Sequence, residues 1–174
     1  MTEKAPSTIK LPRRLRAVAE LISVNAVVAD IGTDHGLLPV YLALTGHARQ
    51  VFASDISDDS LNAARRLAAK YNVSNKITFI NAPGLNGIAQ SGVDTIVIAG
   101  LGGETIVDIL NKTPWQKRQN VKLILQPQSK LYILARFLYN NDYTISQTKT
   151  VIDKGRQYAI LHADTYGCTA EVDQ

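Results

Sequence analysis

The sequence is poor in the features that mark secreted, zinc-binding and membrane proteins. It contains a single cysteine, Cys168, so an intrachain disulfide and a cysteine-based zinc site are both excluded. No apolar run approaches the ~20 residues that a membrane-spanning helix needs. Residues 1–10 are polar and lack the apolar core of a signal peptide. We therefore expect a cytoplasmic protein with no metal, no membrane and no obligatory protein partner.

Length and composition place the chain among ordinary globular domains. Of its 174 residues, 45% are hydrophobic and 20% are charged, which suits one domain with a proper core. We expect residues 1–164 to form this domain and residues 165–174 to form a short tail.

Acidic residues are missing where basic residues cluster. Residues 1–16 carry five basic residues and one acid, and residues 109–141 carry six basic residues and no acid. Arg13, Arg14 and Arg16 lie off the apolar stripe of an expected first helix and should face outward. Clustered Lys and Arg suit a phosphate backbone. A solvated basic surface is the alternative, and we favour a nucleic-acid partner.

The sequence also lacks the G-x-G-x-x-G fingerprint of dinucleotide-binding proteins. In its place, the turn after the first strand-like run has two carboxylates, Asp30 and Asp34, flanking Gly32. A pyrophosphate-binding loop works through backbone N–H groups and a positive helix end, so acids there would be unfavourable. A ligand with a cationic amine, a sulfonium and ribose hydroxyls would favour them. The turn therefore predicts an S-adenosylmethionine (SAM) site.

Apolar periodicity predicts five alternations of strand and helix followed by a hairpin. The expected strands are residues 26–31, 49–54, 76–80, 93–99 and 121–126, the last stopped by Pro127. The expected helices are residues 9–23, 37–44, 59–71, 104–111 and 130–140. Residues 143–151 and 157–163 should form the hairpin. This order predicts an α/β fold with a seven-stranded, mostly parallel sheet, a C-terminal antiparallel hairpin and helices on both faces. It is the Rossmann-like plan of class I methyltransferases, by fold-level analogy.

An acidic residue ends the second expected strand, on the side where open α/β sheets bind ligands. Asp55 is placed to bind both ribose hydroxyls of an adenosine, and capping of the following helix is the alternative. At the start of the helix after the first glycine turn, His35 faces the same crevice, where a structural hydrogen bond competes with a role as a base.

A second glycine turn follows the fourth expected strand. Its three glycines imply that the backbone approaches another group closely, which in this fold is where the target atom meets the methyl group. Glu104 begins the next helix, where it either contacts substrate or compensates the helix dipole. Gln126 and Gln128 end the fifth strand beside this crevice and offer amide groups to a base edge.

Six stretches match a known family over nearly the whole chain. They are L-P-R-R-L-R-A-V-A, D-I-G-T-D-H-G-L-L-P, N-A-P-G-L, I-V-I-A-G-L-G-G, L-I-L-Q-P-Q and G-R-Q-Y-A-I-L. Together they resemble the bacterial tRNA (adenine-22, N1)-methyltransferases of the TrmK type. The pair D-I-G-[ST]-D-H and A-G-x-G-G is the most specific part. The resemblance implies a SAM-dependent enzyme that methylates N1 of an adenine, at position 22, in tRNA.

The resemblance, together with the reasoning from the residues, yields three sets of site residues. The predicted cofactor contacts are Asp30, Gly32, Thr33, Asp34, His35, Asp55, Ile56, Ala82, Pro83, Gly84 and Gly100. The predicted contacts to RNA are Arg13, Arg14, Arg16, Gly103, Gln126 and Gln128. The predicted catalytic residues are Asp34, Glu104 and Gly102.

The chain departs from the family pattern at three points. Pro83 stands where the family usually has an acid, in a loop over the adenine of the cofactor. Gln128 stands where the family usually has Asn. The sequence ends at Gln174, without the family's C-terminal coiled-coil domain. Two alternatives therefore stay open, a non-catalytic SAM- or RNA-binding relative and a small-molecule methyltransferase.

The chemistry expected of such an enzyme needs little proton transfer. N1 of adenine already carries a lone pair, so positioning should supply most of the rate. A carboxylate that accepts a hydrogen bond from N6 would stabilise the positive charge that develops on the base. Asp34 is the first candidate for this role and Glu104 is the second. Because N1 lies on the Watson–Crick edge, a paired adenine must first leave its stack.

Overall fold

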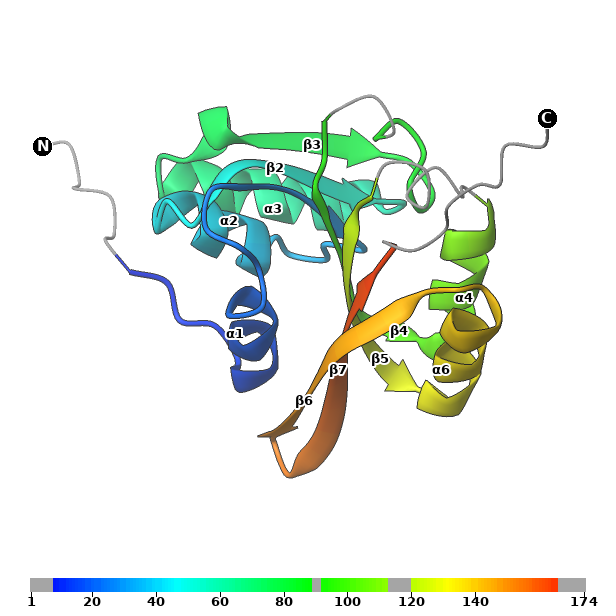
Figure 1. Cartoon of the computed structure of the whole chain (residues 1–174). Helices are drawn as coiled ribbons and strands as arrows, with labels where there is room; N and C mark the ends of the chain where they lie inside the picture. The colour runs from blue at the N-terminus through cyan, green and yellow to red at the C-terminus, as the bar shows by residue number, and fades with distance from the viewer. Residues whose placement is uncertain (1–7, 89–91, 113–119, 166–174) are drawn as a thin grey trace, which may run out of the picture.

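The computed structural model describes residues 8–88, 92–112 and 120–165, and its elements alternate before ending in a hairpin (Figure 1). In chain order they are α1 (Arg13–Ala19), β1 (Ala26–Ile31), α2 (Leu37–Leu44), β2 (Ala48–Asp55), α3 (Asp58–Lys70), the short 3₁₀ helix η1 (Ser74–Lys76), β3 (Ile77–Asn81), β4 (Thr95–Gly102), α4 (Gly103–Lys112), β5 (Lys122–Ser129), α6 (Leu131–Asn140), β6 (Thr144–Asp153) and β7 (Arg156–Asp164).

In the described part of the chain, seven strands form one sheet in the order β3-β2-β1-β4-β5-β7-β6. Strands β1 to β5 run parallel, while β7 is antiparallel to both β5 and β6. The predicted fold class is therefore confirmed. The strand order reverses between β1 and β4, and open α/β sheets bind their ligands at such a switch point.

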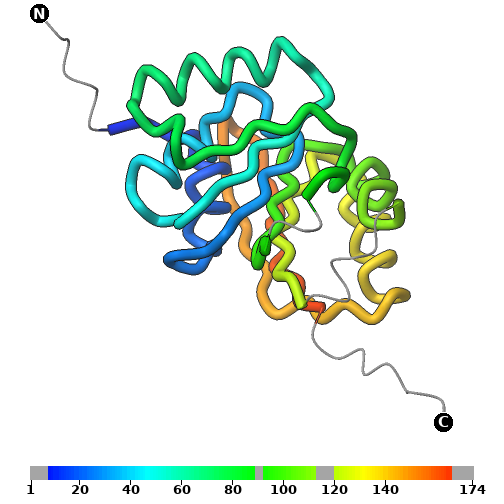
Figure 2. The backbone as a smooth tube through the Cα atoms, turned by 90° about the horizontal axis from the view of Figure 1, so that it is seen from above, coloured from blue at the N-terminus to red at the C-terminus, as the bar shows by residue number. Residues whose placement is uncertain are grey.

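Helices cover both faces of the sheet, as predicted. One hydrophobic core joins α1, α2 and α3 to the sheet, and the other joins α4 and α6 to its opposite face (Figures 1 and 2). Along β1, Val28 belongs to the first core, and Val27 and Ala29 belong to the second. Because side chains alternate along a strand, Asp30 lies on the same face as Val28 and beneath α1 and α2.

Three predicted boundaries were wrong. Helix α1 is shorter than expected, since it begins after Pro12 and ends at Ala19. Strand β4 continues through the second glycine turn to Gly102. Strand β5 does not stop at Pro127 but runs on to Ser129. Proline is tolerated there because β7 pairs with β5 only as far as Leu125, so no neighbour on that side requires an N–H from Pro127.

Several predictions fall outside the described residues. They concern Cys168, the tail beyond Thr165, and residues 113–119 of the basic stretch 109–141 that carries no acid. Among the helices that are described, none is both long enough and apolar enough to cross a membrane.

Candidate active site

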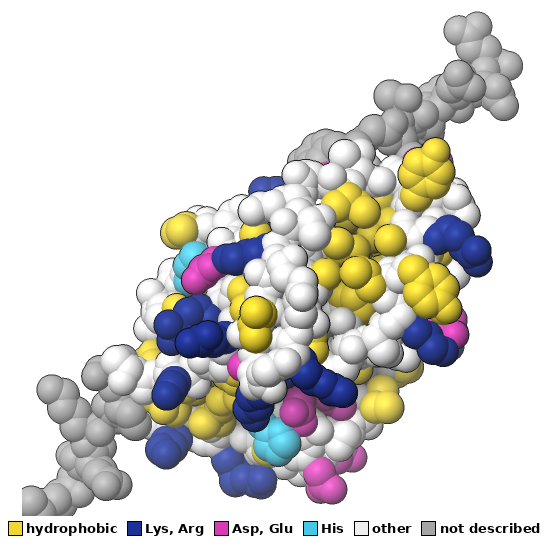
Figure 3. All heavy atoms as spheres, turned by 90° about the horizontal axis from the view of Figure 1, so that it is seen from below, with side chains coloured by type: hydrophobic (Ala, Val, Ile, Leu, Met, Phe, Trp, Pro, Cys, Tyr) yellow, Lys and Arg dark blue, Asp and Glu magenta, His cyan; other side chains and the backbone are white. Residues whose placement is uncertain are grey.

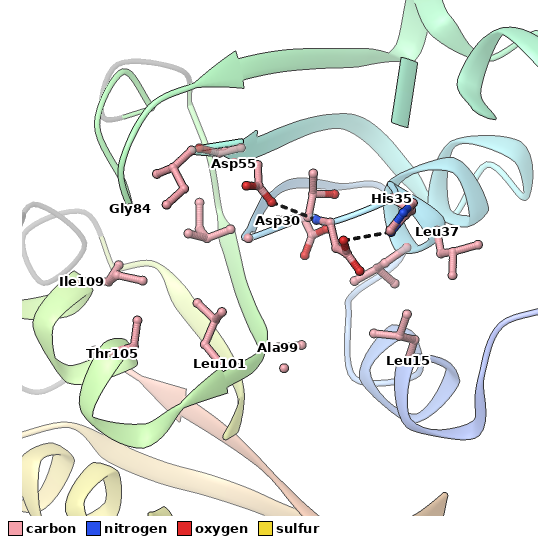
Figure 4. A pocket seen from close by; sticks show the side chains of 18 of the residues that line it. Leu15, Asp30, His35, Leu37, Asp55, Gly84, Ala99, Leu101, Thr105 and Ile109 are labelled. Atoms are coloured by element: carbon pink, nitrogen blue, oxygen red, sulfur yellow. Dashed lines mark hydrogen bonds and ion pairs between the residues drawn. The ribbon is translucent and has the colours of Figure 1, made fainter. Parts of the chain in front are cut away.

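A cavity of about 700 Å³ opens at the carboxyl ends of β1, β2 and β4. Its walls come from the turn after β1, the ends of β2 and β3, the end of β4, and the helices α1 and α4. In Figure 4 the carboxylates of Asp30 and Asp55 lie between Leu15 of α1 on one side and Thr105 and Ile109 of α4 on the other.

The turn after β1 is a tight left-handed structure that brings Asp34 to the mouth of the cavity. Gly32, Asp34 and Gly36 all have positive φ, at 71°, 55° and 74°. A Cβ at Gly36 would lie 2.6 Å from the Cβ of Ala64, so only glycine lets α2 begin against α3. The Asp34 carboxylate pairs with His35 at 2.8 Å, and the side chains of His35 and Asp34 are 67% and 74% exposed. Both side chains therefore lie at the solvent-exposed mouth of the cavity.

Asp55 is held in one orientation by two backbone N–H groups. Its Oδ2 accepts a hydrogen bond from Asp34 N at 3.0 Å (Figure 4). Its Oδ1 accepts one from Ser57 N at 2.9 Å. The side chain therefore orders the start of the first glycine turn while it lines the cavity. The capping alternative fails, because the Ser57 hydroxyl accepts from Ser60 N and caps α3. A fixed carboxylate at the end of β2 suits a ribose diol.

Asp30 is a carboxyl group buried in the cavity floor, with 5% of the residue exposed. Burial raises the pKa of Asp30 from its ordinary 3.8 to about 6, and the nearby Asp55 adds to this shift, whereas the Thr33 hydroxyl opposes it. No Lys or Arg lies within ion-pair distance of Asp30 among the described residues. A buried carboxylate without a cation is a place for a positively charged ligand group.

Comparison with known proteins agrees with this geometry. A methyltransferase-domain family model matches residues 11–161. The tRNA (adenine(22)-N(1))-methyltransferase of Bacillus subtilis is 34% identical over 90% of this chain and 66% of its own, and the crystal structure of the B. subtilis TrmK enzyme superimposes with a TM-score of 0.83. A putative tRNA methyltransferase of Mycoplasma pneumoniae is 34% identical over 88% of this chain and 71% of its own.

The chain belongs to the TrmK-type methyltransferases. Another solved member, a putative tRNA (m1A22) methyltransferase of Streptococcus pneumoniae, was captured with S-adenosyl-L-methionine. It is 27% identical, with a TM-score of 0.84 over 89% of this chain and 73% of its own. The present chain spans about two thirds of the length of the B. subtilis relative.

The predicted cofactor contacts of this TrmK-type chain line the cavity together. The whole cofactor set does so, and so do Arg14 and Gln128 from the RNA set. Arg13, Arg16, Gly102, Gly103, Glu104 and Gln126 are not among the lining residues. Sequence reasoning missed several further lining residues, because nothing in the pattern distinguishes them from ordinary helix and core positions: Pro12, Leu15, Leu37, Leu101, Thr105 and Ile109.

Arg14 does not face outward as predicted. It is half-buried and lines the cavity, where its Nη1 donates to Gln126 Oε1 at 3.1 Å and its guanidinium lies over the Tyr158 ring. Arg13 and Arg16 on the same helix are exposed, as expected. The pattern of the helix contained the signal for this difference, because Arg14 lies three residues after the buried Leu11 and four before the buried Val18.

Gln126 is not available to a base edge as predicted. It is fully buried, and its Oε1 accepts hydrogen bonds from both Arg14 and the backbone N of Gly100. Its Nε2 donates to Pro127 O at 3.0 Å. The side chain is thus a structural link between β4, β5 and α1, whereas the exposed Gln128 reaches the cavity.

Tertiary packing, which the sequence did not reveal, requires a glycine at position 103 in the second glycine turn. A Cβ at Gly103 would lie 2.4 Å from the carbonyl oxygen of Lys130, so the start of α4 meets the backbone before α6. Glu104 lies outside the cavity and forms an ion pair with Lys130 at 2.5 Å, both side chains being largely exposed. This hydrogen bond raises the pKa of Lys130. Gly102 is less restricted, since a Cβ added there would lie 3.4 Å from Ser129 Oγ.

Proposed function

We propose that this chain is a SAM-dependent tRNA methyltransferase that modifies N1 of an adenine, at position 22 by its likeness to the B. subtilis enzyme. The observation that carries the proposal is the pair of carboxylates in one cavity. Asp55 is fixed by two backbone N–H groups, and Asp30 is buried with no cation within ion-pair distance among the residues that the structure describes. Such an enzyme would act in the cytoplasm on unmodified tRNA.

The cavity fits the cofactor in size and in chemistry. Its volume of about 700 Å³ lies within the range of small-molecule sites, ~300–1,000 Å³. Asp55 would bind the ribose hydroxyls, and Ile56 and Pro83 would provide apolar contacts for the adenine. Asp30 would bind the ammonium group of the methionyl end. The bound cofactor supplies an electrophilic methyl group on its sulfonium.

The protein's own contribution would be positioning and electrostatics. Gly100 and Gln128 line the side of the cavity toward β4 and β5, where the target base would enter. Asp34 is exposed at the mouth, and its backbone N–H is held by Asp55. Its carboxylate would accept a hydrogen bond from N6 of the target adenine. Glu104 is a weaker candidate because it pairs with Lys130 outside the cavity.

The basic residues of α1 would contribute the contacts to tRNA phosphates. Arg13 and Arg16 are exposed, and neither is in an ion pair among the described residues. On the face seen from below, many Lys and Arg side chains gather toward the left of the view, the side on which α1 lies (Figures 1 and 3). Phosphate contacts of this kind would offset the cost of unstacking the adenine.

The first test is cofactor binding followed by methyl transfer. Calorimetry with SAM should detect binding by the native chain and by Asp59→Ala, an exposed acid on α3, but not by Asp55→Ala. Methyl transfer to unmodified tRNA should then yield N1-methyladenosine in digested nucleosides, and tRNA with guanine at position 22 should yield none. Absence of both binding and transfer would refute the proposal.

A second candidate follows from where the family departures fall. Pro83 and Gln128 both line the cavity, which favours a relative that binds cofactor or RNA without transferring the methyl group. In that case SAM and tRNA bind, yet no N1-methyladenosine forms even at stoichiometric enzyme. Methylation of small nucleosides with no response to tRNA would instead identify a small-molecule methyltransferase.

A further inference from the structure

The outward face of α6 carries two strongly exposed aromatic side chains. Tyr132 and Tyr139 are 69% and 83% exposed, whereas every other Tyr and Phe that the structure describes is buried or half-buried. The opposite face of α6 is attached to the core by Leu134 and Leu138. The packing of the helix therefore gives no reason for two aromatic side chains on its outer face.

An unpaired arginine lies between the two tyrosines. Tyr132, Arg136 and Tyr139 follow the i, i+4, i+7 spacing that aligns side chains along one face of a helix. At 1.5 Å of rise per residue, the two tyrosines are about 10 Å apart along the helix axis. Arg136 is exposed and forms no ion pair with any described residue, whereas Lys130 before the helix pairs with Glu104. We call Tyr132, Arg136 and Tyr139 the aromatic face of α6.

This aromatic face suits an anionic chain that carries flat rings. Helix α6 contains no acidic residue. On the face seen from below, hydrophobic side chains and several basic ones gather toward the right of the view, the side on which α6 lies (Figures 1 and 3). Tyrosine rings stack on unpaired bases, and an arginine among them binds phosphate or stacks as well. A second copy of this chain fits less well, because a two-fold contact centred on this face would bring two Arg136 side chains together.

The aromatic face also begins close to the cavity. Gln128 lines the cavity near the end of β5, and α6 begins three residues later at Leu131. The helix then runs back along the sheet, as the connection between the parallel strands β5 and β6 requires. An RNA strand whose target base enters the cavity would therefore reach this face within a few nucleotides.

We propose that the aromatic face of α6 binds unpaired bases of the tRNA near the target adenine, with Tyr132 and Tyr139 stacking on bases and Arg136 contacting a phosphate between them. This inference rests on the proposed function, because it names a surface that holds the RNA substrate of the same enzyme. It differs in kind from the contacts of α1, which offer charge to any phosphate backbone, since stacking requires bases that are not in a duplex.

Three RNA probes test the inference at one fixed salt concentration by fluorescence anisotropy: unmodified tRNA, a single-stranded oligoadenylate and an RNA duplex of equal charge. Replacing Tyr132 and Tyr139 together by Ala should weaken binding of the tRNA and the oligoadenylate about 10- to 100-fold, and binding of the duplex less than about threefold. Replacing both by Phe keeps the rings and should preserve native affinity. Val24→Ala, which shortens an exposed apolar side chain before β1, is the control and should change none of the three affinities.

Calorimetry with SAM on the same proteins separates this inference from the proposed function. If native protein neither binds SAM nor methylates tRNA, the proposed function fails, and the RNA comparison still decides what α6 binds. If SAM binds and the double-alanine variant binds all three RNAs like native protein, the function stands and the inference is overturned. Equal losses for oligoadenylate and duplex, or an equal loss in the double-phenylalanine variant, would overturn it as well, since stacking would not be the cause. A native dimer that the double-alanine variant converts to a monomer in sedimentation, with RNA affinity unchanged, would assign the face to a second copy.

Discussion

Replacing Asp30 by Asn should stabilise the ligand-free protein and damage the cofactor site. The pKa of Asp30 is raised in the folded state from 3.8 to about 6, mainly by burial. The folded protein therefore holds this proton more tightly than the unfolded chain. The contribution of Asp30 to the free energy of unfolding is therefore most favourable at low pH. It decreases as the pH rises from about 4 to about 6, and it does not change further above pH 6. At pH 7 the cost of the buried charge is ~3 kcal/mol.

A neutral isostere removes that cost. Urea denaturation of Asp30→Asn at pH 7 should give a free energy of unfolding higher by ~1–3 kcal/mol, and a melting temperature higher by roughly 5 °C. At pH 4 the carboxyl group of the native protein is mostly protonated, so the difference should shrink to about 0.5 kcal/mol. Calorimetry should show that the variant loses most of its affinity for S-adenosylhomocysteine.

Asp55→Asn provides the contrast. The Asp55 carboxylate accepts two backbone hydrogen bonds, one on each oxygen, and an amide keeps only one of these acceptors. This variant should lose about 1 kcal/mol of stability at pH 7. The reasoning about Asp30 would be refuted by an Asp30→Asn variant less stable than native protein at pH 7. That result would mean that hydrogen bonds to the ionised Asp30 outweigh its desolvation.

Three further predictions follow from the same geometry. Affinity for S-adenosylhomocysteine should fall about tenfold per pH unit below pH 6 and stay flat above it, since Asp30 must be ionised to pair with the ammonium; the Asp30→Asn variant should lack this profile in calorimetry. Gly103→Ala should cost more than ~2 kcal/mol in urea denaturation because its Cβ would meet the Lys130 carbonyl, and near-native stability would contradict the packing argument. Replacing Arg13 and Arg16 together by Ala should weaken tRNA binding and make its salt dependence shallower; an unchanged slope would exclude this helix from the interface.

The sequence predicts this fold well because its determinants are local. Strand-like runs alternate with helical periodicity, and the terminal hairpin is signalled by its turn at Lys154-Gly155. Asp55 and the first glycine turn are also predictable, since a strand end and a change of periodicity mark them on the chain. These features depend on neighbours within a few residues, which a sequence pattern contains.

The errors concern contacts between distant segments. The sequence pattern places Gln126 at a base edge, but its partner Arg14 is 112 residues away in the chain, so nothing local indicates that it is buried. The pattern also does not reveal the packing of Gly103, because the approach of the Lys130 carbonyl is a tertiary contact. Pro127 is predicted to end its strand because the sequence does not show where β7 stops pairing.

The terminal hairpin does more than complete the sheet, because it supports the helix that carries Arg14. Asp153 on β6 accepts from the backbone of Arg14, Lys149 on β6 pairs with Glu20 just after α1, and Tyr158 on β7 lies against the Arg14 guanidinium. The cavity wall at Arg14 is thus supported by the last strands of the domain. A substitution that removes one of these links between the hairpin and α1, such as Asp153→Ala, should therefore weaken the binding of SAM in calorimetry, even though Asp153 lies outside the cavity. An unchanged affinity would contradict this role of the hairpin.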